Sequence, residues 1–133
     1  MAFTKLTAGN LLNHFFGKTV YTPVTLYLGL STTTGGDNIS EISSGIGYDR
    51  IATSEADWAA ADITGNATVR NISTFNFTQA TGNWGTIREA VLFDSPTIGT
   101  GNALARADAS SDKIISTDDI VIILPDKLSF ILF

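Results

Sequence analysis

The sequence contains no cysteine, and only one of its 133 residues, His14, is a histidine. Without cysteine the chain cannot form a disulfide, a catalytic thiolate or a cysteine-rich zinc site. A serine–histidine–acid triad or a histidine metal site would depend on His14 alone, which is predicted to lie on the polar side of a helix. These absences argue against most hydrolase and metal chemistry. They favour a non-enzymatic protein with no cofactor and no bound metal.

Charge is also scarce, because charged residues make up 16% of the chain against about 25% in typical soluble domains. The eight basic residues are scattered, no two are adjacent, and the net charge is −5. Binding to phosphate backbones needs clustered lysine and arginine, so nucleic acid is not an expected partner. Low charge together with 44% hydrophobic residues favours a subunit that buries part of its surface in an assembly.

Long apolar runs are missing too. No stretch approaches the roughly 20 apolar residues of a transmembrane helix, and residues 1–18 lack the pattern of a signal peptide. We therefore expect no membrane partner and no export by the usual signal.

What the chain does contain is a series of short apolar or alternating segments separated by glycine-rich turns. The expected strands are residues 24–30, 68–77, 86–93, 103–107, 120–124 and 128–133. The last two strands are strongly apolar, and the chain ends in one of them. This pattern predicts a single all-β domain spanning residues 1–133, of the β-sandwich or jelly-roll type.

Helical periodicity occurs once, over residues 7–16, where four apolar side chains share a face: Leu11, Leu12, Phe15 and Phe16. Thr7 is the expected N-cap and Gly17 the expected stop signal. We expect this face to cover the open end or edge of a sheet. The least patterned segment is residues 31–47, which we interpret as a long loop suited to binding a partner.

Two groups of acidic residues could in principle carry chemistry. Glu55 and Asp57 lie beside Trp58, the nearest approach in this sequence to an acid pair with an aromatic platform. The loops at 37–41 and 108–112 hold oxygen ligands of the kind that calcium prefers, but neither fits an EF-hand. Solvated charges and turn formation explain both groups better.

Several segments, in this order and spacing, resemble a widespread family of small bacteriophage virion proteins, known as tail fibre or minor tail proteins, some of which look like capsid decoration proteins. After the helix come Tyr21-Thr22-Pro23 and a strand, a loop with Glu41-Ile42, and a G-Y-x-R element at residues 47–50. The most distinctive segment is N-W-G-T-I at residues 83–87. Val91-Leu92-Phe93-Asp94 and Gly101-Asn102-Ala103-Leu104 follow. The apolar end after Ser116-Thr117-Asp118-Asp119 departs from the family pattern.

The resemblance implies that the conspicuous residues hold the fold or an interface together. These structural-motif residues are Tyr48, Arg50, Trp84, Gly85 and Asp94. The candidate interface lies in three segments that could be completed by a partner, the helix face, the long loop and the final strand. Its residues are Leu12, Phe15, Phe16, Ile39, Ile42, Phe130 and Phe133.

Three functions remain open from the sequence. The favoured one is a capsid decoration or cement protein in the virion, which packs between capsomers and binds the major capsid protein and itself, preferably as a trimer. The alternative is a tail fibre, tail tip or baseplate subunit that binds other virion proteins. A remote third, based only on Trp58 and its neighbouring acids, is a carbohydrate-binding or hydrolytic module.

Overall fold

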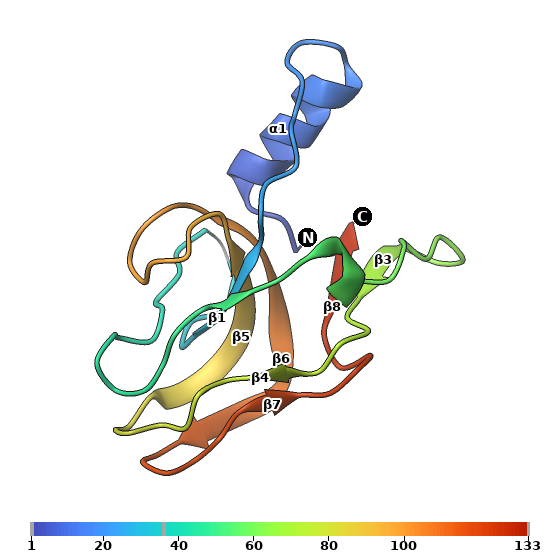
Figure 1. Ribbon diagram of the computed structural model, residues 1–133. Helices are drawn as coiled ribbons and strands as arrows, with labels where there is room; N and C mark the ends of the chain where they lie inside the picture. The colour runs from blue at the N-terminus through green and yellow to red at the C-terminus, as the bar shows by residue number, and fades with distance from the viewer. Residues whose placement is uncertain (1, 36, 133) are drawn as a thin grey trace.

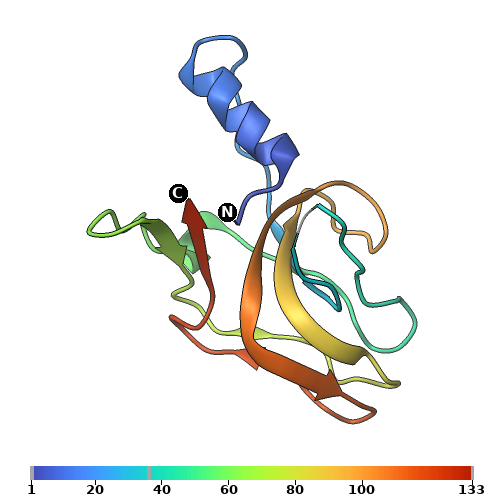
Figure 2. The same cartoon turned by 180° about the vertical axis from the view of Figure 1, so that it is seen from behind.

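The computed structural model describes residues 2–35 and 37–132, and Figures 1 and 2 show it from opposite sides. Within these residues one α-helix precedes eight strands and one short 3-10 helix. The elements are α1 (Lys5–Phe15), β1 (Tyr27–Ser31), β2 (Ile51–Ala52), η1 (Glu55–Asp57), β3 (Ala67–Arg70), β4 (Phe75–Asn76), β5 (Gly85–Phe93), β6 (Ala103–Ile115), β7 (Ile122–Ile123) and β8 (Ser129–Leu132). The prediction of an all-β fold with a short N-terminal helix is confirmed.

The main sheet is antiparallel and has the strand order β2-β1-β5-β6. Leu28 lies opposite Leu92 and Leu30 opposite Ala90, and all four side chains point into the core. The opposite face of β1 is also buried, since Ser31 is fully covered by the loop that follows it. The predicted strand 24–30 is thus realised as β1 from Tyr27 onward, while Val24 and Thr25 are exposed before it.

The layer that packs against this sheet is split into two small sheets, β3–β8 and β4–β7. Val69 pairs with Phe130, and Phe75 pairs with Ile123. The buried core lies between the layers and includes Tyr48, Phe75, Phe77, Trp84, Leu128 and Phe130 as well as the leucines of β1. Burial of these large side chains is the main stabilising contribution to such a fold.

The N-terminal segment joins the two layers. Phe3 forms an antiparallel bridge with Ala105 of β6, the backbone N–H of Arg106 donates to the carbonyl of Ala2 (2.8 Å), and the N–H of Ala2 donates to Ile131 of β8 (3.5 Å). Residues 2–4 thus run between the edges of β6 and β8.

Several strands differ in length from their predicted ranges. The predicted strand 103–107 extends to Ile115, through an exposed polar segment that has no alternating apolar pattern. The predicted strand 68–77 divides into β3 and β4 near Ile72, where its alternation changes phase. The predicted strand 120–124 shortens to β7, which pairs with β4 at Ile122 and Ile123.

None of the helices formed by the described residues is long and apolar enough to cross a membrane.

Candidate functional site

The sequence predicted that the apolar face of the helix covers the end or edge of a sheet. In the structure α1 instead projects from the β domain. Figures 1 and 2 both show it standing clear of the strands, with the returning chain beside it. The helix begins two residues earlier than predicted because Thr4, not Thr7, caps it: the Thr4 hydroxyl accepts from the N–H of Thr7 (3.5 Å). It also donates to the carbonyl of Ala103 (2.9 Å), which fixes the root of the helix to β6.

We call residues 4–24 the arm. Its returning half is held to the helix by hydrogen bonds, since the N–H of Lys18 donates to the carbonyl of Asn13 (2.8 Å). The N–H of Tyr21 donates to Nδ1 of His14 (3.1 Å). Gly17, with φ of 72°, makes the reversal possible in a conformation that other residues seldom adopt. The single histidine therefore has a structural partner in the arm.

The tip of the arm is apolar and exposed. The exposed fractions are 59% for Leu12, 82% for Phe15 and 68% for Phe16, and the two aromatic rings pack edge to face with centroids 5.2 Å apart. Val20 on the returning half is also exposed. Contiguous exposed apolar surface is unusual on a monomer, and this cluster is therefore a candidate surface for binding another protein. The predicted interface residues Leu12, Phe15 and Phe16 lie together here.

Three further predicted interface residues, Ile39, Ile42 and Phe130, lie in the β domain and not on this surface. Ile42 and Phe130 are buried in the domain's own core, because β8 and the loop after β1 both fold over it. Their assignment to an exposed interface is therefore corrected. Ile39 is half-buried in the loop at residues 37–43, and Phe133 lies outside the described residues.

A buried ion pair holds two loops of the β domain together. Arg50 and Glu41 form two hydrogen bonds, from Nε to Oε2 (2.8 Å) and from Nη2 to Oε1 (2.7 Å). The side chain of Arg50 is 1% exposed. Its Nη1 donates to the carbonyls of Ser95 (2.6 Å) and Thr100 (3.1 Å), and its guanidinium lies 3.7 Å from the ring centre of Phe93. Arg50 therefore ties the loop at residues 32–50 to the loop at 94–102.

Tyr48 completes this network. Its hydroxyl donates to Glu41 Oε2 (2.6 Å) and accepts from the N–H of Leu30 in β1 (3.0 Å). Burial and the Glu41 carboxylate both raise the pKa of Tyr48. Burial also raises the pKa of Glu41, but hydrogen bonds from Arg50, Tyr48 and Gly99 outweigh it and hold that pKa below its usual value. The carboxylate is thus a fully used acceptor inside the fold.

Trp84 is likewise a buried residue whose polar group is hydrogen-bonded within the domain. Its ring is buried, packs edge-on against Tyr48 (centroids 5.5 Å apart) and Phe77 (6.4 Å), and its N–H donates to the carbonyl of Ile46 (2.8 Å). Gly85 follows it with φ of 88°, the turn by which the chain enters β5.

Asp94 caps the loop that follows β5, accepting from the N–H (2.6 Å) and the side-chain amide (3.0 Å) of Asn102. Burial raises the pKa of Asp94, but these bonds bring it below its ordinary value. The loop closed in this way supplies the carbonyls of Ser95 and Thr100 to Arg50. Asp94 thus belongs to the same locked corner of the domain.

Two structurally important residues were missed by the sequence analysis. Glu41 was noted only as part of a motif, although it is the acceptor at the centre of the network. Asn71 is fully buried and clamps the chain before β8: its amide donates to the carbonyl of Leu124 (3.0 Å) and its Oδ1 accepts from the N–H of Leu128 (2.9 Å). The available signal for Glu41 was an acid nine positions before Arg50, in the loop predicted at residues 31–47, whose one other charged residue is Asp37.

Of the two acids beside Trp58, Asp57 is used for local structure and Glu55 is exposed. Asp57 accepts from the N–H (2.8 Å) and the hydroxyl of Ser54, which hold the pKa of Asp57 below its usual value. The Trp58 ring packs against Phe75 and Phe130, and its N–H donates to Thr53 (3.2 Å). The ring therefore supports the core and does not form an open platform.

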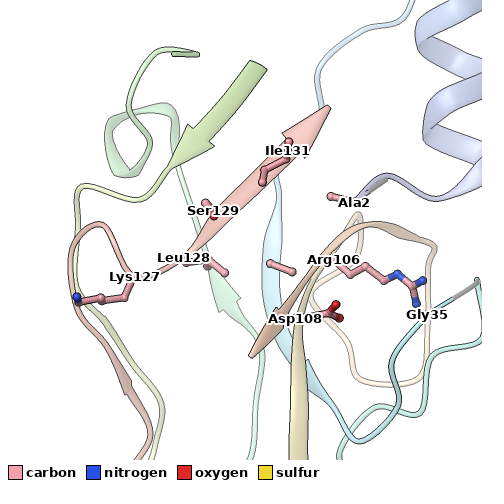
Figure 3. A pocket seen from close by; sticks show the side chains of 9 residues that line it. Ala2, Gly35, Arg106, Asp108, Lys127, Leu128, Ser129 and Ile131 are labelled. Carbon is pink, nitrogen blue, oxygen red and sulfur yellow. The ribbon is translucent and has the colours of Figure 1, made fainter. Parts of the chain in front are cut away.

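An open slot of about 480 Å³ lies between the edges of β6 and β8. Figure 3 shows Arg106 and Asp108 on one side of it, Ser129 and Ile131 on the other, and Ala2 at its end. Arg106 turns its Nη1 toward Glu89 Oε2 at 3.6 Å, and Glu89 is fully buried. Burial raises the pKa of Glu89, and the nearby Arg106 offsets only part of that rise. The described residues of this slot present no group of three potential metal ligands.

Glu89 allows a prediction about the pH dependence of stability. Because its pKa is higher in the folded than in the unfolded chain, its contribution to stability is full below the ordinary glutamate pKa and is lost as the pH rises through the folded value. We expect Glu89→Gln to raise the melting temperature at about pH 7 and to change it little at about pH 4. Calorimetry at both pH values tests this. A lower melting temperature for the variant at neutral pH would show that attraction to Arg106 outweighs desolvation.

A comparison with models of known protein families identifies the family of this chain. The family model described as podophage GP4 fiber I protein gp80 matches residues 2–130. The chain belongs to this family of phage fibre proteins. A search of curated proteins found no match.

Membership makes this chain a structural component of the phage virion, as the sequence resemblance implied. Proteins of this structural class are generally non-enzymatic, and the motif residues described above are engaged in holding the fold together. The exposed arm is left as the candidate functional site.

Proposed function

We propose that this protein is a tail-fibre subunit that is held in the virion through the apolar tip of its arm. The observation that carries this proposal is the contrast between the arm and the domain. Tyr48, Arg50 and Trp84 are buried and hydrogen-bonded within the domain. Leu12, Phe15 and Phe16, in contrast, are exposed on a segment that stands away from the core. The family description supports a fibre better than the capsid decoration role favoured by the sequence alone.

The location in the virion is tested by labelling purified phage with an antibody to the β domain and recording electron micrographs. We expect label at the tail. Label distributed over the head would contradict the proposal and support a cement protein.

The role of the arm is tested by the double substitution Phe15→Asp and Phe16→Asp. Both side chains are exposed, so we expect the melting temperature to stay within a few degrees of the wild type, the range typical of surface changes. We expect the variant to be absent from virions or strongly depleted, because charge at the centre of an apolar contact is costly. Quantitative immunoblotting of purified particles measures this.

The matched control is Ile63→Asp, which places the same charge at an equally exposed apolar residue in the loop before β3. It should enter virions normally. Normal incorporation of the Phe15/Phe16 variant would mean that attachment does not use the arm.

A further inference from the structure

A second exposed apolar surface lies on the β domain. Ile120, Ile122 and Leu124 alternate along the segment that contains β7, and between 52% and 55% of each side chain is exposed. The residues between them, Val121 and Ile123, turn inward and pack against the core. We call the three outward residues the β7 stripe. Such alternation puts one row of side chains on each face of a strand, so the stripe is an outward sheet face made of large aliphatic groups.

The arm and the β7 stripe lie at opposite ends of the molecule. In both Figure 1 and Figure 2 the arm is at the top, and β4 and β7 are at the bottom. The arm of one copy therefore cannot reach the stripe of the same copy. It can reach the stripe of another.

The charges of the two surfaces are complementary. The arm contains no acid, and Lys18 lies two residues after the tip residue Phe16, whereas Lys5 begins α1 at the root of the arm, away from the tip. The rest of the chain has six basic and thirteen acidic residues, a net charge of −7. The stripe is flanked by three exposed acids, Asp118, Asp119 and Asp126, against one lysine, Lys127. An apolar centre with charged residues at its rim is the usual composition of a protein interface, and opposite charges favour one partner and orientation over others.

We propose that the arm of one copy docks on the β7 stripe of the next, so that subunits join head to tail. The proposal rests on the arm being the attachment element and names its acceptor as a second copy of this chain. A contact between two different surfaces of identical subunits closes into a ring or continues as an open filament, depending on the rotation between neighbours.

Two variants with complementary defects test the proposal. The arm variant carries Leu12→Asp and Phe15→Asp, and the stripe variant carries Ile120→Asp and Ile122→Asp. All four side chains are exposed, and circular dichroism and thermal unfolding verify that both variants fold. Ile63→Asp is again the control. Analytical ultracentrifugation is run up to ~1 mM protein, where even weak contacts become visible.

We expect the wild type and the control to form species larger than a dimer. Each variant alone should associate at least ~100-fold more weakly. An equal mixture of the two variants should form a dimer and nothing larger, because one intact arm and one intact stripe remain to meet. Adding salt should weaken association of the wild type, and so should Lys18→Glu.

Other outcomes overturn the proposal, and they separate it from the proposed function. If the stripe variant assembles as the wild type does, the arm binds another surface or another arm. If the mixture stays monomeric, or the wild type is monomeric at every concentration, copies do not join in this way. If the stripe variant enters virions normally while the Phe15/Phe16 variant does not, the arm binds a different virion protein. That last result would leave the tail-fibre function standing.

Discussion

Arg50→Ala is expected to destabilise the β domain by about 3–5 kcal/mol, the usual consequence of removing one partner of a buried ion pair. The substitution leaves the Glu41 carboxylate in the interior without its two strongest donors, and it frees the carbonyls of Ser95 and Thr100. It also removes the cation from the face of Phe93. Because both loops of this corner depend on the same guanidinium, we expect them to loosen together.

Urea unfolding monitored by tryptophan fluorescence measures this effect. Asp112→Ala is the matched control, since it breaks an ion pair with Arg88 in which both side chains are largely exposed. Such surface pairs contribute about 0–1 kcal/mol. If the two substitutions lower the free energy of unfolding by the same amount, the Glu41–Arg50 pair does not hold the two loops together. Arg50→Lys should recover little, because a lysine cannot make the paired hydrogen bonds of a guanidinium.

Trp84→Ala is expected to cost about 3–5 kcal/mol, through lost burial and the cavity that the indole leaves between Tyr48 and Phe77. Trp84→Phe separates two contributions, because it keeps an aromatic ring but removes the hydrogen bond from the indole N–H to the carbonyl of Ile46, which still accepts from the N–H of Thr81 (3.0 Å). The loss of one such hydrogen bond costs about 0.5–1.5 kcal/mol. Equilibrium unfolding of both variants, with far-UV circular dichroism as the signal, gives the comparison. A loss below about 1 kcal/mol for the alanine variant would mean that the ring is not packed in solution.

The residue pattern predicted the strands that are apolar or regularly alternating. β1, β5 and β8 follow from such patterns, since burial selects side chains with a period of two along a strand. The polar half of β6, at Asp108–Lys113, carries no such signal because its side chains are exposed. It is held by pairing with β5 at its two ends, Asp108 with Glu89 and Lys113 with Ile87, with a register shift between them. Such a long-range contact is not encoded in the local sequence.

The site was predicted in part. The apolar face of the helix was recognised, but the amphipathic pattern left two interpretations, packing on the sheet of the same chain and binding to a partner. Periodicity identifies which face is apolar; it does not say whether that face meets the core or another molecule. Phe130 and Ile42 were wrongly assigned to the interface, because an apolar residue near the end of a chain or in a loop can equally complete the core. Only the positions of the surrounding strands separate the two cases.

The attachment of the arm to the β domain has a mechanical consequence. One end of the arm is the segment 2–4, bonded along β6, and the other end leads into β1. β1 and β6 lie on either side of β5 in the main sheet. Tension applied at the tip is therefore divided between two strands that share one neighbour. The returning chain enters β1 from its end, so the force is directed along β1. The backbone hydrogen bonds between β1 and β5, from Tyr27 to Ser31, are then loaded in shear and resist the force together. A subunit of this design transmits load from its projecting tip into the centre of its largest sheet.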